Sequence, residues 1–187
     1  MKRAVILHGT GGSPESNWFR WLESTLREHG YEVWLPALPH AEQPSLREWA
    51  DYLHANAPFP LDEQTLTIGH SSGAILGLIV TQEAPVSIGA VVGVSVFRDN
   101  SLEWRPNNRL FDVPFNFPAI KAKTHKLLFI NADNDPYVPL DQARYVADNC
   151  AAELIVIPGQ GHFNLERSKD YAKFPKLIEL LEERNLL

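Results

Sequence analysis

Short apolar segments recur along this chain, separated by longer segments whose apolar residues have helical spacing. Six of the apolar segments have the length of strands, and they span residues 3–8, 31–36, 65–70, 88–96, 126–132 and 153–158. Most are apolar at consecutive positions rather than at every second position. A strand of this kind must be covered on both faces, which is typical of a parallel sheet.

The segments between the predicted strands indicate helices. They span residues 17–30, 46–57, 72–84, 141–150 and 169–185. In the last of them, Pro175 predicts a kink or a late helix start. Alternation of strand and helix predicts the α/β class, here a compact, mainly parallel six-stranded sheet with helices on both faces.

One segment breaks this rhythm. Residues 97–126 contain Pro106, Pro114 and Pro118 among several aromatic side chains and show no clean periodicity. A long irregular segment in a compact domain is usually functional, so we expect part of it, residues 97–120, to cover a binding pocket. At 187 residues and 44% hydrophobic composition, the chain suits a single domain spanning 1–187 without a large cap domain.

Charge and composition exclude several classes of function. The net charge is −6 and the basic residues are scattered, so neither nucleic acid nor a membrane surface is expected as a partner. The apolar run before His8 is too short for a signal peptide, and no run reaches membrane-spanning length. Cys150 is the only cysteine, which excludes an intramolecular disulfide. These features predict a cytoplasmic protein and leave its oligomeric state open.

The stretch GHSSG, residues 69–73, fits the pattern G-x-S-x-G, with a predicted strand before it and a predicted helix after it. That pattern places a serine on a sharp strand-to-helix turn, where flanking glycines remove steric clashes. The spacing selects Ser71 as the nucleophile and leaves the backbone N–H of Ser72 at the helix N-terminus. The alternative is an ordinary turn of small residues at a strand–helix junction.

A nucleophilic serine needs a base and a group that orients the base. His162 follows the last predicted strand, and Asp135 follows the strand before it, with Asp133 as the second candidate for the acid. Loops after parallel strands meet at one sheet edge, so these side chains are expected to converge. The chain order Ser71, Asp135, His162 is the order found in α/β-hydrolases.

The glycine-rich stretch HGTGG, residues 8–12, follows the first predicted strand. Its turn could present the N–H of Thr10 to a developing oxyanion. A phosphate loop is the competing interpretation, but the Gly-Lys-Ser/Thr continuation is missing. His8 and His70 lack partners at zinc-like spacing, so structural roles are expected for both, and we predict neither a metal nor a cofactor.

Five stretches, HGTGGSPESNWFRWL, GYEVWLPALP, GHSSGA, NADNDPYVP and GQGHF, together resemble the small serine hydrolase family of retinoblastoma-binding protein 9. The resemblance spans nearly the whole chain and implies a compact α/β-hydrolase with little or no lid. It implies Ser71 as nucleophile, Asp135 as acid, His162 as base, and the N–H groups of Thr10 and Ser72 as oxyanion hole.

The same resemblance carries one property that this chain does not share. The family's best-known animal member is named for a retinoblastoma-binding motif, leucine-x-cysteine-x-glutamate. Here Cys150 lies in DNCAAEL, which does not fit that motif. Retinoblastoma binding is therefore not expected.

The sequence thus predicts a metal-independent hydrolase that cleaves an ester or amide bond of a small substrate through an acyl-enzyme. Trp18, Phe97 and Trp104 are candidate substrate contacts, with a place in the core as the alternative for each. A thioesterase uses the same triad, and a binding protein with little turnover could keep the same scaffold.

Overall fold

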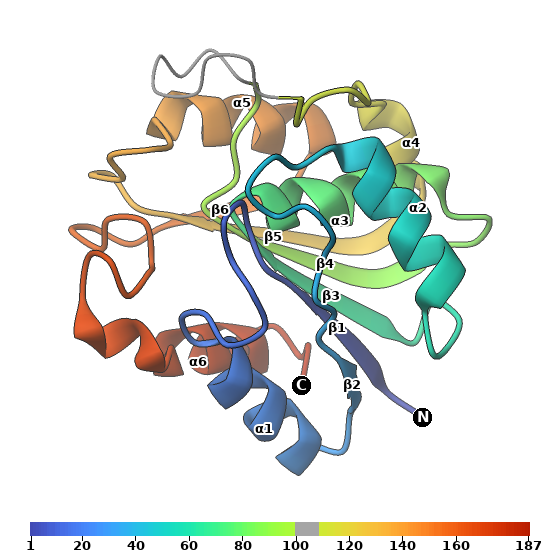
Figure 1. Ribbon diagram of the computed structural model, residues 1–187, viewed down its shortest axis with the longest axis horizontal. Coiled ribbons are helices and arrows are strands. Elements are labelled where there is room, and N and C mark those ends of the chain that lie inside the picture. The colour runs from blue at the N-terminus through green and yellow to red at the C-terminus, as the bar shows by residue number, and fades with distance from the viewer. Residues whose placement is uncertain (100–108) are drawn as a thin grey trace.

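The computed structural model describes residues 1–99 and 109–187, and within them the six predicted strands form one sheet (Figure 1). The strands are β1 (Arg3–Leu7), β2 (Glu32–Trp34), β3 (Thr65–His70), β4 (Ile88–Val94), β5 (Thr124–Asn131) and β6 (Glu153–Val156). Their order is β2-β1-β3-β4-β5-β6, and every neighbouring pair is parallel. The predicted six-stranded α/β architecture is confirmed, and the described residues include no large cap domain.

Helices cover both faces of the sheet, as consecutive apolar strand residues require. One face carries α1 (Phe19–Glu28) and α6 (Pro175–Glu183), and the other carries α2 (Leu46–Asn56), α3 (Ser72–Glu83), α4 (Phe117–Ala122) and α5 (Leu140–Cys150) (Figure 1). In β1, Val5 and Leu7 join the core under α2–α5, whereas Ala4 and Ile6 join the core under α1 and α6. Successive buried residues of β1 therefore pack against two different cores.

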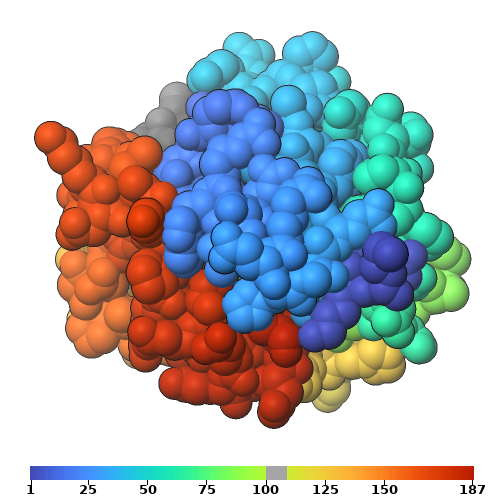
Figure 2. Space-filling view, turned by 90° about the horizontal axis from the view of Figure 1, so that it is seen from below, coloured from blue at the N-terminus to red at the C-terminus, as the bar shows by residue number. Residues whose placement is uncertain are grey.

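The segment around α1 packs beside the C-terminal segment, and both lie on the face covered by α1 and α6. Figure 2 shows the segment around α1 in blue beside the C-terminal segment in red. The hydroxyl of Tyr31, just after α1, donates to the carbonyl of Leu186 at 2.6 Å. The last helix begins at Pro175, preceded by a short 3₁₀ turn, η1 (Lys169–Ala172). The prediction of a late start at this proline is confirmed.

The irregular segment holds a helix that the sequence pattern did not indicate. Helix α4 begins after Asn116, whose side chain accepts a hydrogen bond from the N–H of Ala119 at 3.1 Å. Pro118 lies in its first turn, where a proline is tolerated, and Ile120 is fully buried. Trp104 and Pro106 lie outside the described residues.

Because the sheet is parallel, the loops after β1, β3, β5 and β6 emerge at the same edge. All of the predicted catalytic residues lie in these loops or at the start of α3. Among the described residues, no helix is both long and apolar enough to cross a membrane.

Candidate active site

Ser71 lies between β3 and α3 with a strained backbone. Its φ of 55° and ψ of −124° are rarely adopted by a non-glycine residue. The N–H of Ser71 donates to the carbonyl of Val94 in the adjacent strand at 2.8 Å, which anchors the turn to the sheet. Strain of this kind persists only where the surroundings impose it, and it aims the hydroxyl out of the sheet edge.

The two glycines around this turn are required by close backbone contacts. A Cβ at Gly69 would lie 2.3 Å from the carbonyl oxygen of Gly73. A Cβ at Gly73 would lie 2.3 Å from the carbonyl oxygen of Leu7, at the end of β1. The first glycine thus clears the start of α3, while the second lets that helix pack against the neighbouring strand.

The structure brings the predicted base and acid together. Nδ1 of His162 lies 2.7 Å from Oδ2 of Asp135, and this nitrogen carries the proton because a carboxylate only accepts. The same oxygen accepts from the hydroxyl of Ser95 at 3.0 Å. The other oxygen, Oδ1, accepts from the N–H groups of Tyr137 at 2.9 Å and Val138 at 3.1 Å.

These hydrogen bonds keep Asp135 ionised despite its burial. Burial alone would raise the pKa of this carboxyl. The hydrogen bonds from His162, Tyr137 and Ser95 outweigh burial, so the pKa lies below its ordinary value. A charged, fixed acceptor results, and it sets both the tautomer and the ring orientation of His162.

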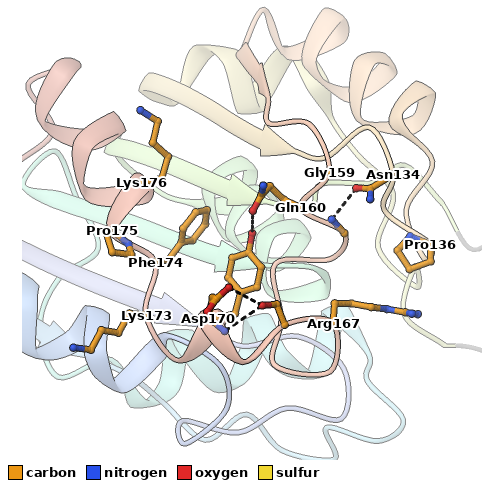
Figure 3. Close-up of a pocket in the computed structure, with 13 residues that line it drawn as sticks. Asn134, Pro136, Gly159, Gln160, Arg167, Asp170, Lys173, Phe174, Pro175 and Lys176 are labelled. Atoms are coloured by element: carbon orange, nitrogen blue, oxygen red, sulfur yellow. Dashed lines mark hydrogen bonds between the residues drawn. The ribbon is translucent and has the colours of Figure 1, made fainter.

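Asp133 and Asn134 connect the loop after β5, which carries Asp135, to the loop after β6, which carries His162. Oδ1 of Asp133 accepts from the N–H of Gly159, and Oδ1 of Asn134 accepts from the N–H of Gly161, both at 2.8 Å. Figure 3 shows the contact of Asn134 with the loop before His162. The second candidate for the acid, Asp133, therefore contacts the backbone of the histidine loop and not the histidine ring.

Two further rings support the histidine loop from inside the protein. Nε2 of His70 lies 2.8 Å from the carbonyl oxygen of His162, and the indole N–H of Trp18 donates to the carbonyl of Phe163 at 3.0 Å. Burial lowers the pKa of His70 to about 3, with His162 as a lesser cause, so its ring is neutral at ordinary pH. Trp18 has no exposed surface and lies beneath the site, not in contact with its pocket.

The glycine-rich loop after β1 lies beside the start of α3. Oγ1 of Thr10 is 2.6 Å from Oγ of Ser72. Among the described residues, the backbone N–H groups of Thr10 and Ser72 have no hydrogen-bond partner, so both are available to an anion. His8 fixes this loop, because its Nδ1–H donates to the carbonyl of Gly9 at 2.9 Å and its Nε2 accepts from the N–H of Leu38 at 3.0 Å.

Ser71 and His162 line one pocket of about 490 Å³. No hydrogen bond joins the hydroxyl of Ser71 to His162 within the described part of the chain, although such bonds often tighten only when substrate binds. The pocket is also lined by Phe19, Tyr137, Asn164 and Glu166, which the sequence analysis did not single out. Three of them could have been found by their proximity in sequence, because Tyr137 follows the acid and Asn164 and Glu166 follow the base within a few residues.

Phe97, by contrast, does not line this pocket. It is buried, packs against Phe111 with ring centroids 5.5 Å apart, and belongs to the core under α2–α5. Trp104, the other aromatic candidate of that segment, is outside the described residues. A second pocket, of about 640 Å³, is lined by residues of the acid and histidine loops, among them Gln160, and by Phe174 and Lys176 (Figure 3).

No metal centre is indicated among residues 1–99 and 109–187, which contain no group of three side chains suited to hold an ion. Both ring nitrogens of His8 are occupied by backbone groups, and Nε2 of His70 contacts a carbonyl. The observed contacts give both histidines structural roles.

Comparison with known proteins shows the family and the fold of this chain. Residues 4–183 match a family model described as serine hydrolase. Serine hydrolase RBBP9 of Rattus norvegicus is 27% identical over 165 residues, which cover 86% of this chain and 87% of the rat protein. Among solved structures, the ydeN gene product of B. subtilis has a TM-score of 0.85 at 23% identity and 98% coverage of both chains. A carboxylesterase of the thaumarchaeon Nitrososphaera gargenis has a TM-score of 0.71 at 15% identity, covering 97% of this chain and 90% of that one.

Proposed function

This chain belongs to the serine hydrolase family, and from that membership we propose that it cleaves a carboxylic ester or amide bond of a small substrate. The observation that carries the proposal is the hydrogen bond between Asp135 and Nδ1 of His162, beside a serine on a strained turn. A histidine oriented in this way has its Nε2 available to act as a base. The pocket of about 490 Å³ suits a small substrate.

In the proposed mechanism, Nε2 of His162 removes the proton of Ser71 as Oγ attacks the substrate carbonyl carbon. The carbonyl π electrons move to oxygen, and the resulting oxyanion accepts hydrogen bonds from the N–H groups of Thr10 and Ser72. His162 then gives its proton to the leaving alcohol or amine as that bond breaks. Asp135 stabilises the imidazolium that exists between these two transfers.

The acyl-enzyme is released by the same steps with water as the nucleophile. His162 removes a proton from water, the hydroxide adds to the acyl carbon, and Ser71 Oγ leaves with that proton. The free acid and the starting enzyme result. No cofactor enters this scheme, because the triad supplies both proton transfer and the nucleophile.

The experiment that tests the proposal is labelling with a fluorophosphonate probe, read by intact mass. The folded parent should take up one equivalent of probe, and Ser71→Ala and His162→Ala should take up none. Ser72→Ala is the matched control, because it removes the adjacent hydroxyl but keeps the backbone N–H, and it should still reach full labelling. An unlabelled but folded parent would contradict the proposal and favour a binding protein with little turnover. A labelled parent would then be assayed for hydrolysis of ester, thioester and amide substrates.

A further inference from the structure

Two buried N–H donors hold consecutive carbonyls of the loop that carries His162. The donor to the carbonyl of His162 is Nε2 of His70, and the donor to the carbonyl of Phe163 is Nε1 of Trp18. His70 is 4% exposed and Trp18 is fully buried, so water does not compete for either bond. Both donors come from the N-terminal half of the chain and reach across to its C-terminal part.

The backbone around His162 needs such support. Gly161 has a φ of +60° and Phe163 a φ of +51°, so the histidine is flanked on both sides by left-handed residues. A bulky residue such as phenylalanine rarely adopts this conformation unless its surroundings impose it. The two carbonyl hydrogen bonds are part of those surroundings and fix the direction in which the histidine leaves the backbone.

Three further contacts hold the loop upstream of the histidine. Asp133 and Asn134 accept hydrogen bonds from the N–H groups of Gly159 and Gly161, respectively. The hydroxyl of Tyr171 donates to the side chain of Gln160 at 2.7 Å, and the contacts of Asn134 and Gln160 are drawn in Figure 3. Among the described residues, none of these contacts reaches the carbonyl of residue 162 or 163. The support at those two carbonyls therefore falls to His70 and Trp18.

His70 also connects the base to the nucleophile. It directly precedes Ser71 in the chain, and its ring lies 4.8 Å from the ring of His162, centroid to centroid. Because burial keeps this ring neutral, it places no positive charge beside the imidazolium that His162 would form. A neutral N–H donor at this place thus supports the base without opposing its protonation.

We propose that His70 is a positioning residue that orients His162 by donating a hydrogen bond to its backbone carbonyl. Trp18 supports the same loop by donating to the next carbonyl, that of Phe163. The inference rests on the proposed function, in which His162 is the base. It assigns a role to the variable residue of the G-x-S-x-G stretch, which the serine hydrolysis scheme itself does not use.

The test compares two replacements of His70. In His70→Gln the side-chain amide N–H can take the place of Nε2–H, whereas His70→Met fills a similar volume without a donor. We expect His70→Met to lower kcat about 10- to 100-fold with KM little changed, because a base misplaced by about 1 Å loses rate on that order. His70→Gln should recover most of this loss. Leu181→Ala, a core substitution on α6 that removes no hydrogen bond, controls for loss of stability alone.

A second readout does not depend on turnover. The Nδ1 proton of His162, hydrogen-bonded to Asp135, should give a downfield NMR signal in the parent and in His70→Gln, and a broadened or absent one in His70→Met. Equal signals and equal kcat in folded His70→Met and parent would overturn the proposal. If His70→Met does not fold, Trp18→Phe removes the neighbouring donor while keeping an aromatic ring, and an unchanged kcat and signal there would overturn it. A parent that shows the signal but no turnover and no phosphonate labelling would instead contradict the proposed function.

Discussion

Oγ1 of Thr10 and Oγ of Ser72 lie 2.6 Å apart, so one hydrogen bond joins the loop after β1 to the first turn of α3. These are the two residues whose backbone N–H groups are proposed to bind the oxyanion. Their side chains are not the donors, but the bond between them sets the spacing of the two donors. Preorganised spacing matters because each oxyanion donor contributes to the rate only when it is aimed at the developing charge.

We expect Thr10→Val to lower kcat about 10-fold with little change in KM. Valine keeps the shape and the backbone N–H but loses the hydroxyl, so the effect should be smaller than the roughly 10²–10³-fold loss typical of removing a donor. Thr10→Ser keeps the hydroxyl and should lose much less. Ser72→Ala breaks the same bond, so the double variant with Thr10→Val should be little worse than either single variant. Fully additive losses in steady-state kinetics would contradict this account.

Replacing Asp135 with asparagine should inactivate the enzyme without unfolding it. The amide oxygen of the introduced asparagine can still accept from the N–H groups of Tyr137 and Val138, while its NH₂ group faces His162 and donates to Nδ1. The proton then moves to Nε2, which can no longer act as a base, so kcat should fall about 10⁴-fold.

Asp133→Asn is the matched control for that substitution. Asparagine keeps an oxygen that can accept from the N–H of Gly159, so activity should stay within about threefold of the parent if Asp133 only braces the loop. Steady-state hydrolysis and circular dichroism of both variants decide the assignment. A large loss in Asp133→Asn together with an active Asp135→Asn would make Asp133 the acid.

The strands and the candidate catalytic residues could be predicted from the sequence because both depend on short local patterns. The buried strands, the turn at Ser71 and the loop positions of Asp135 and His162 all follow from short segments and from the rule that parallel strands end at one edge. Helix α4 was not predicted, because it is short and its residues lie among prolines and aromatic side chains. Burial of Ile120 and the cap at Asn116 stabilise it, and neither gives a helical pattern in the sequence.

Side-chain contacts between residues far apart in sequence could not be predicted from local patterns. The hydrogen bond from His70 to His162 spans 92 positions, and no local pattern encodes such a partner. Phe97 and Trp18 were predicted as substrate contacts because the sequence does not distinguish an aromatic side chain that lines a pocket from one that fills the core. Only packing separates the two outcomes, and here it places both side chains in the core.

His70 should also make stability depend on pH. Its pKa in the folded state is about 3, lowered from 6.5 chiefly by burial, so below about pH 6.5 the unfolded chain binds a proton that the folded chain does not. The free energy of unfolding should therefore fall as pH falls from about 6.5 toward 3. His70→Gln removes this titration, and its stability should fall less steeply over that range.

Urea unfolding of the parent and His70→Gln at several pH values between about 4 and 7 measures this difference. Some slope should remain in the variant, because burial also lowers the pKa of His8, with the same sign. Parallel curves for the two proteins would show that His70 titrates normally and that its burial is not as described.

The glycines of the turn provide the sharpest steric prediction. A Cβ at position 73 would lie 2.3 Å from the carbonyl oxygen of Leu7, and neither backbone can move without separating α3 from β1. Gly73→Ala should therefore destabilise the protein by about 3 kcal/mol or more. Gly30→Ala is the control, because Gly30 has a φ of +82° but no atom within 4 Å of the added Cβ, so only backbone strain of about 1–2 kcal/mol applies. Denaturant unfolding of the two variants compares them directly, and equal losses would mean that the close approach of α3 to β1 is not what requires glycine at position 73.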